Sequence, residues 1–127
     1  MPNPQARNRT IRIVDNADDP VQDLPTKMTA TTGDAVVWFV LNESSDTARL
    51  KIKDFKKKPG GQAVNAVDFI VQTVTVDPGE EAIIVGEVVF LPSGSSGTIQ
   101  STKYTVDARL GTNPKVIYDP DLDIEKP

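Results

Sequence analysis

Polar and apolar residues alternate with a period of two along most of this chain. Successive side chains of a β-strand point to opposite faces of the sheet, so such alternation predicts strands that bury one face. Residues 49–53 show it most clearly, because Leu50 and Ile52 are apolar while the residues beside them are cationic. No stretch of about a dozen residues has the 3.6-residue period of an amphipathic helix. The pattern therefore predicts an all-β chain.

The apolar runs predict about seven or eight strands separated by turn signals, a rhythm typical of an antiparallel Greek-key β-sandwich. The segments lie at residues 10–15, 27–31, 35–42, 49–53, 67–76, 82–90 and 98–106, and residues 116–118 with 121–125 close the chain. Residues 35–42 are apolar on both faces and predict a central strand. Gly86, inside residues 82–90, predicts a bulge or the close approach of a neighbouring backbone. Residues 107–115 are expected to form a loop.

No repeat or linker divides the chain, and 127 residues suffice for one core. We expect a flexible N-terminus over residues 1–9 and a single domain over residues 10–127. The N-terminal segment is polar and lacks the apolar part of a signal peptide, which favours the cytoplasm; a leader removed beforehand would instead place the protein in the periplasm or outside the cell. No apolar run approaches the roughly 20 residues of a membrane span, so a soluble protein is expected.

The chain contains no cysteine and no histidine. Thiolate nucleophiles, thiolate zinc sites and imidazole acid–base chemistry are therefore excluded, and carboxylate or lysine chemistry remains. We expect no cofactor. The net charge of −4 disfavours a nucleic-acid partner, since phosphate neutralisation dominates that affinity. The charge is unevenly spread, with +2 over residues 1–63 and −6 over residues 64–127.

Three segments, in this order, resemble a cupredoxin, the plastocyanin- and azurin-like β-sandwich. Thr32-Gly-Asp-Ala-Val-Val-Trp38 is similar to the family's entry into a central strand, and Asn42 follows near the strand's end. Val76-Asp-Pro-Gly-Glu80 resembles the turn before the next strand, and Lys103-Tyr-Thr-Val106 with residues 119–125 resembles the last two strands. The resemblance covers roughly residues 28–125 and implies the family's Greek-key sandwich.

The resemblance also implies where copper would bind. In the family, one histidine follows the tryptophan strand, and a cysteine, a second histidine and usually a methionine come from the loop before the last strand. Here these positions fall near Thr47 or Ala48, near Val106 and within residues 107–115, and none offers a soft ligand. The resemblance therefore implies a copper-free sandwich that serves as a binding or structural module.

The densest run of positive charge is a candidate interaction patch. It comprises Arg49, Lys51, Lys53, Lys56, Lys57 and Lys58, offset by Asp54. Such a patch suits an acidic protein, an anionic polymer or lipid headgroups. The alternative is a solvated edge strand and loop whose lysines discourage edge-to-edge pairing, and the acidity of the whole chain favours it.

The acidic end of the chain suggests a second site. Asp119, Asp121, Asp123 and Glu125 would share one face of an extended strand. Calcium prefers oxygen ligands, but same-face strand positions lie about 6.5–7 Å apart, which favours a solvated face instead. Trp38, in the middle of an apolar run, is expected in the core.

Together these features predict a non-catalytic binding or protein-interaction module. Its partner would be another protein or a second copy, because the uneven charge would let the basic strand of one molecule meet the acidic end of another. Two alternatives remain open. One is a structural or assembly component of a virion, an appendage or a cell surface, and the other is a carboxylate-dependent hydrolase with two acids of raised pKa in a cleft.

Overall fold

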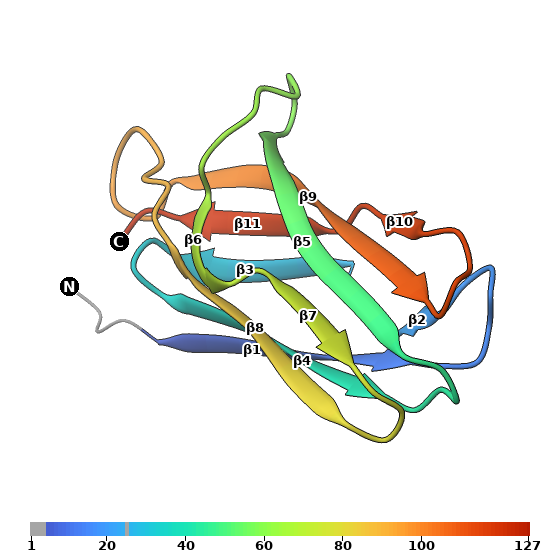
Figure 1. The fold of residues 1–127 in the computed structure, drawn as a ribbon. Helices are drawn as coiled ribbons and strands as arrows, with labels where there is room; N and C mark the ends of the chain where they lie inside the picture. The colour runs from blue at the N-terminus through green and yellow to red at the C-terminus, as the bar shows by residue number, and fades with distance from the viewer. Residues whose placement is uncertain (1–4, 25) are drawn as a thin grey trace.

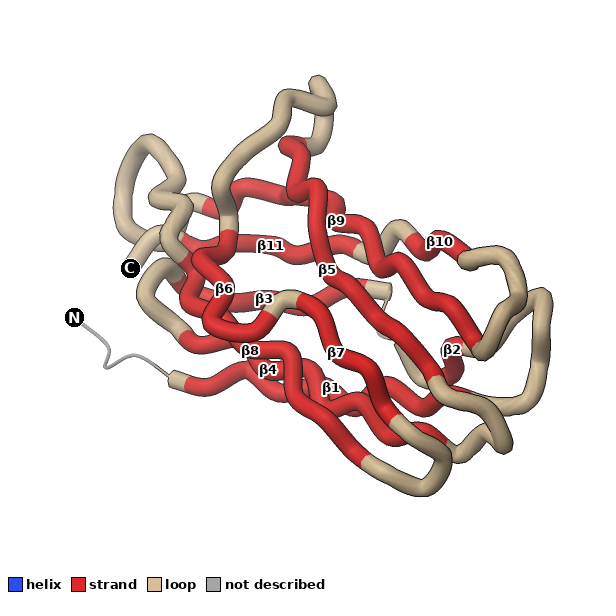
Figure 2. The backbone as a smooth tube through the Cα atoms, viewed as in Figure 1, coloured by secondary structure: helices blue, strands red, loops and turns tan. Residues whose placement is uncertain are grey.

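The computed structural model describes residues 5–24 and 26–127. Two sheets pack face to face as a Greek-key β-sandwich (Figure 1). In this part of the chain, strands are joined by loops and turns without any helix (Figure 2). The all-β prediction is therefore confirmed.

The first sheet has five strands in the order β2-β1-β4-β8-β6. Their bounds are Ala6–Ile13 for β1, Val21–Gln22 for β2, Ala35–Asn42 for β4, Val67–Val71 for β6 and Glu81–Val88 for β8. β4 lies in the middle between β1 and β8, as its apolar run predicts. Its inward-facing side chains Val36, Trp38 and Val40 are fully buried.

The second sheet has six strands in the order β3-β11-β9-β5-β7, with β10 paired to β9. Their bounds are Lys27–Thr31 for β3, Ala48–Lys57 for β5, Thr73–Val76 for β7, Ile99–Leu110 for β9, Val116–Tyr118 for β10 and Asp121–Glu125 for β11. β5 and β9 form a long antiparallel pair at the centre of this sheet. Leu50 and Ile52 of β5 face the core, as the alternation predicts.

Aromatic side chains join the two sheets across the core. Trp38 of the first sheet meets Tyr104 of β9 edge-on, with ring centroids 5.8 Å apart, and its Nε1 donates a hydrogen bond to the Tyr104 hydroxyl at 3.3 Å. Phe55 of β5 stacks on Tyr104 with centroids 5.1 Å apart. Burial raises the pKa of Tyr104 to about 12. Trp38 is thus a core residue, as expected.

The first strand begins earlier than the sequence pattern predicts. Residues 6–9, expected in a flexible segment, belong to β1 and pair in register with residues 35–38 of β4. Residues 1–4 of that expected segment lie outside the described residues. The strand escaped the sequence pattern because Ala6, Asn8 and Arg9 are exposed and provide no apolar period.

Three further expectations are corrected by the strand topology. The pairs β1–β4 and β3–β11 are parallel, whereas the other described pairs are antiparallel, and side-chain alternation alone does not encode strand direction. Residues 67–76 form two strands, because the chain passes between the sheets at Gln72, whose Nε2 donates to the Ile52 carbonyl at 2.9 Å. β9 continues to Leu110, so residues 107–110 are strand rather than loop.

Asp34 connects the start of β4 to neighbouring segments through a buried carboxylate. Its Oδ1 accepts a hydrogen bond from the Gln5 amide at 2.9 Å, and its Oδ2 accepts from the Thr31 amide at 2.9 Å and from Arg7 Nε at 3.1 Å. Burial acts to raise the pKa of Asp34, but the bonds from Thr31, Gln5 and Arg7 together outweigh it, so the pKa is lowered. The ionised carboxylate is therefore part of the folded structure.

Lowering the pH should weaken the fold through Asp34. Its folded-state pKa lies below the unfolded value of about 3.9, so its stabilisation is complete above that value and is lost as the pH falls through the folded pKa. Asp34→Asn should cost about 1–3 kcal/mol at neutral pH and flatten this acid dependence. Urea unfolding across the acidic range measures both effects. Asp18→Asn, at an exposed loop acid, should change neither, and an Asp34→Asn variant as stable as wild type would contradict the assignment.

β6 passes very close to β8 at Gly86. A Cβ placed on Gly86 would lie 2.6 Å from Val67 Cγ1, 2.7 Å from the Asp68 carbonyl oxygen and 3.1 Å from Phe69 Cα. The pairing of the two strands also shifts register between Phe69 and Val71. The predicted close backbone approach is confirmed, and only glycine fits at this point without a shift of β6.

Gly86→Ala should destabilise the protein by about 1–3 kcal/mol, because the Asp68 carbonyl belongs to the backbone and cannot rotate away. Urea denaturation at neutral pH provides the measurement. Glu87→Ala, at the next and outward-facing position of β8, should change the free energy of unfolding by about 0.5 kcal/mol or less. Equal costs for the two substitutions would show that the close approach is not a real constraint.

Candidate functional site

The first half of β5 presents three cations of the predicted patch on the outer face of the six-stranded sheet. Arg49 and Lys51 are exposed and Lys53 is partly buried, while the alternate residues Leu50 and Ile52 fill the core. The strand alternation thus places these three cations on one surface, as the sequence predicts.

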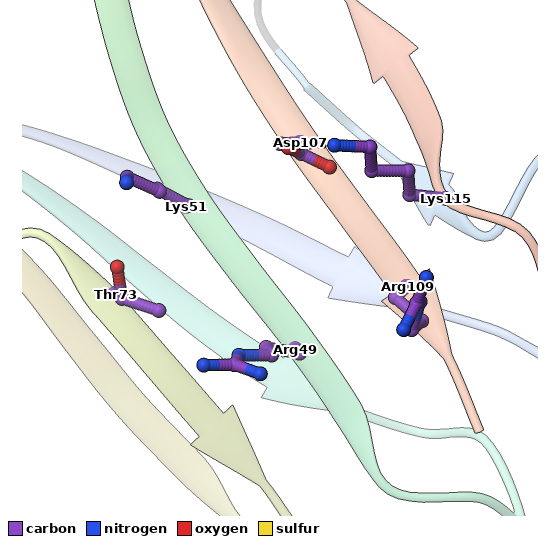
Figure 3. A pocket seen from close by; sticks show the side chains of 6 residues that line it. All are labelled: Arg49, Lys51, Thr73, Asp107, Arg109 and Lys115. Atoms are coloured by element: carbon purple, nitrogen blue, oxygen red, sulfur yellow. Dashed lines mark hydrogen bonds and ion pairs between the residues drawn. The ribbon is translucent and has the colours of Figure 1, made fainter. Parts of the chain in front are cut away.

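Two cations from elsewhere in the chain join them. Arg109 lies near the end of β9, and Lys115 immediately precedes β10. A depression of about 280 Å³ is lined by Arg49, Lys51, Thr73, Asp107, Arg109 and Lys115 (Figure 3). We call Arg49, Lys51, Lys53, Arg109 and Lys115, with Asp107 between them, the basic face.

Asp107 is the carboxylate at the centre of the basic face. Its Oδ2 lies 3.5 Å from Lys53 Nζ and 3.4 Å from Lys115 Nζ. Lys115 extends toward Asp107, whereas Lys51 points away from it although the two residues are paired across β5 and β9 (Figure 3). Asp107 therefore neutralises part of the local charge, and a strong excess of positive charge remains.

Arg49 and Arg109 lie directly opposite each other on β5 and β9. Like charges at directly opposite positions of an antiparallel pair are destabilising. Neither guanidinium forms an ion pair with a carboxylate in residues 5–24 and 26–127. The pair thus presents two planar donor groups, each with its hydrogen-bonding capacity open to an anion.

The remaining lysines of the predicted patch lie elsewhere. A bulge at Asp54, whose φ is 57°, shifts the register of β5 between Lys53 and Lys56. Lys57 Nζ lies 5.5 Å from the centroid of the Phe90 ring, and Lys58 Nζ lies 2.9 Å from Asp121 Oδ2. The six residues predicted as one patch therefore form two groups, and Lys56, Lys57 and Lys58 do not line the depression.

Sequence reasoning missed Arg109 and Lys115 because residues 107–115 were expected in a loop. A signal was present, since Lys103, Thr105, Asp107 and Arg109 continue the alternation of β9 on its outer face. The pairing of β9 with β5 then brings that face beside Arg49. This long-range pairing is what the sequence alone did not reveal.

The acids at the end of the chain are largely paired with lysines of other strands. Asp121, Asp123 and Glu125 share the outer face of β11 beside β9. Lys58 contacts Asp121 and Lys27 Nζ contacts Asp123 Oδ2, each at 2.9 Å, and Lys103 Nζ lies 3.7 Å from Asp119 Oδ2. In the described part of the chain, no three acidic, histidine or cysteine side chains are grouped so that they could hold a metal ion. The acids at the end of the chain thus form ion pairs across neighbouring strands, and Asp123 is buried.

Two carboxylates, those of Asp34 and Asp15, have a pKa clearly lowered from its ordinary value. Asp34 is described above, and hydrogen bonds from the backbone and side chain of Ser45 lower the pKa of Asp15. A general acid that works near neutral pH needs a raised pKa instead.

The part of the chain that the structure describes contains no helix that could span a membrane.

No protein-family model matches the chain, and neither does any curated protein. Solved structures do match. A structure of the CsuC–CsuE chaperone–tip adhesion subunit pre-assembly complex from Acinetobacter baumannii Csu pili aligns at a TM-score of 0.64 with 15% identity, over 81% of this chain and 55% of that one. The periplasmic chaperone SfaE aligns at 0.65 with 10% identity, over 80% and 54% of the two chains. PapD-like domain 7 of human CEP192 aligns at 0.54 with 11% identity, over 82% of both chains.

The likeness is one of fold. At these identities it extends to the β-sandwich and not to the residues of any site. The chain spans about half the length of the two chaperone-related structures that it matches. Multicopper oxidases also match, with TM-scores below 0.5. The chaperone-related structures support a β-sandwich fold for this chain, and the resemblance to cupredoxins holds only at that level.

Arg109→Glu should stabilise the protein by about 0.2–1 kcal/mol, because it replaces a repulsive cross-strand pair with an attractive one. Urea unfolding at low salt measures the gain, which should shrink as salt is added. Arg9→Glu, which makes the same change of charge on exposed β1, serves as the control. A loss of stability specific to Arg109→Glu would contradict the inferred repulsion between Arg49 and Arg109.

Proposed function

We propose that this chain is a non-catalytic protein-interaction module whose basic face binds an acidic segment of a partner protein. The observation that carries the proposal is the Arg49–Arg109 pair, two arginines at directly opposite strand positions whose guanidinium groups have no carboxylate partner among the described residues. Each guanidinium matches a carboxylate in a bidentate arrangement. An acidic segment would therefore relieve the repulsion between the arginines as it binds.

The distribution of charge favours a protein segment over a nucleic acid. Asp121, Asp123 and Glu125 of β11 occupy the same outer surface as the basic face, two strands away from β5. A nucleic acid carries a phosphate at every step, and a long strand crossing this sheet would meet these acids. A short acidic segment can contact the basic face alone. The chain's net charge of −4 acts in the same direction.

The structural neighbours support a role in protein binding. One of them is part of a complex between a chaperone and a tip adhesion subunit before assembly, so a protein with this kind of sandwich contacts another protein there. The first sheet here also exposes Ile70, Val71 and Ile83 on or beside β6 and β8, and neighbouring exposed apolar side chains are typical of protein contact surfaces.

Two alternative functions stay open beside this proposal, and so does the assignment of the fold as cupredoxin-like. A structural or assembly component would use the same surface to contact copies of one chain. A carboxylate-dependent hydrolase would need two acids in one cleft, one with a raised pKa. The cupredoxin-like description would add a copper-free interior, and Ala48 and Val106, at positions where the resemblance places ligands, are buried apolar residues with no donor atom in their side chains.

Binding of a fluorescein-labelled decaglutamate peptide, followed by fluorescence anisotropy at low salt, tests the proposal. Wild type should bind, and affinity should fall as salt rises. The double variant Arg49→Glu/Arg109→Glu should weaken binding at least about tenfold, the equivalent of 1.4 kcal/mol.

The control variant is Arg9→Glu/Lys126→Glu, which changes the net charge equally away from the basic face. It should bind within about twofold of wild type. Equal losses of decaglutamate affinity in both variants would show that net charge, and not the basic face, determines binding. Tighter binding to a single-stranded DNA of matched charge would contradict the proposed partner class.

A further inference from the structure

A cleft of about 600 Å³ opens between β5 and β6, beyond the end of the β5–β7 pairing. β7 pairs with β5 only from Ala48 to Lys51, and the Gln72 carbonyl then accepts a hydrogen bond from the Ile52 amide at 3.3 Å. The next neighbour is Val64, whose amide donates to the Phe55 carbonyl at 2.9 Å. The cleft lies where β5 lacks a paired strand, between these two contacts.

The inner lining of the cleft is aromatic and aliphatic. Phe55, Ala66 and Val67 are buried, and Val64 and Phe69 are partly buried. The Phe55 and Phe69 rings lie 6.2 Å apart, and Phe69 in turn stacks on Trp38 at 6.1 Å. Phe69 thus carries the aromatic cluster of the core outward to an accessible surface.

The outer lining is polar and carries two carboxylates, those of Asp54 and Asp68, both exposed. Neither carboxylate has a hydrogen-bond or ion-pair partner in the described residues. Lys53 also lines the cleft, but its Nζ lies 3.5 Å from Asp107 on the basic face, so its charge is already engaged there. The accessible charge around the aromatic ring is therefore negative.

We propose that this cleft receives an arginine side chain, with the guanidinium over the Phe69 ring and hydrogen-bonded to Asp54 and Asp68. A planar cation over an aromatic face, flanked by carboxylates, combines a cation–π contact with charge-assisted hydrogen bonds. Arginine suits the site better than lysine, because its flat, weakly hydrated head stacks on rings while donating in its own plane.

That the arginine belongs to a protein partner rests on the proposed function. Lys53 borders both surfaces, so the cleft adjoins the basic face along β5. The fitting partner carries an acidic stretch with an arginine close by. The cleft itself is a separate site, with lining residues that do not include Arg49 or Arg109.

The test is a titration of the full chain with N-acetyl-arginine methylamide, followed through amide chemical shifts by NMR. The citrulline analogue, which has the same shape without the charge, is the comparison ligand. Saturable shifts at residues 64–69 are expected with arginine, together with binding at least about fivefold weaker for citrulline. Equal affinity for both ligands, shifts centred elsewhere or no saturable shift would overturn the proposal.

Asp54→Asn/Asp68→Asn is the decisive variant, because asparagine tolerates the left-handed conformation of Asp54 and both positions are exposed. It should weaken arginine binding about fivefold, and Phe69→Leu should do so with the acids intact. Glu81→Gln/Asp77→Asn, which also neutralises two exposed acids, should leave binding unchanged. Unchanged affinity in the decisive variant would overturn the site.

The two sites are separated by a crossed comparison. Arg49→Glu/Arg109→Glu should keep arginine binding while losing decaglutamate binding, and Asp54→Asn/Asp68→Asn should do the reverse. A wild-type chain that binds decaglutamate but not arginine would refute the cleft and leave the basic face in place. A wild-type chain that binds arginine but not decaglutamate would refute the proposed function and leave the cleft.

Discussion

The burial of β4 is the constraint on which the rest of the sandwich depends. Its inner face contributes Val36, Trp38 and Val40 to the core, and burial of such side chains is the main favourable term in folding. Both ends of the strand nevertheless carry buried polar residues. Asp34 collects hydrogen bonds at one end, and at the other the Asn42 Nδ2 donates to the Asp46 and Val76 carbonyls, each at 2.8 Å. A buried polar group without a partner is costly, so these bonds also fix where β4 begins and ends.

This core in turn determines the geometry of the basic face. Trp38 contacts Tyr104 of β9, and Tyr104 stacks on Phe55 of β5, so one aromatic cluster fixes both central strands of the second sheet. A slip of one residue in either strand would exchange its buried and exposed faces. The register that buries Leu50 and Tyr104 therefore also places Arg49 opposite Arg109. The repulsion between these arginines is tolerated because the aromatic and aliphatic packing beneath them outweighs it.

The sequence could predict those features of the structure that depend on residues close together in the chain. A continuous apolar run located β4, alternation located the first half of β5, and the isolated glycine at position 86 indicated the close approach of β6. The same rule missed residues 6–9, which extend past the apolar part of β1 and show no period. It also could not show that β9 pairs with β5, so Arg109 and Lys115 were not associated with Arg49. Half of the basic face was therefore predictable from local pattern, and the other half depended on contacts between residues far apart in sequence.

A single irregularity in β5 separates the two proposed sites. The extra residue at Asp54 shifts the register with β9, so that Phe55 faces the core and Lys56 faces outward opposite Lys103, farther along the strand than the basic face. The same bulge lies on the stretch of β5 that no strand covers, where the cleft opens above Phe69. Bulges bend a strand and redirect its side chains, and they are common beside binding sites. With strict alternation and no bulge, Phe55 would face outward beyond Lys53; the bulge instead turns Phe55 toward the core, where it lies against Phe69 in the lining of the cleft. The bulge therefore lies between the surface proposed to bind an acidic segment and the cleft proposed to receive an arginine.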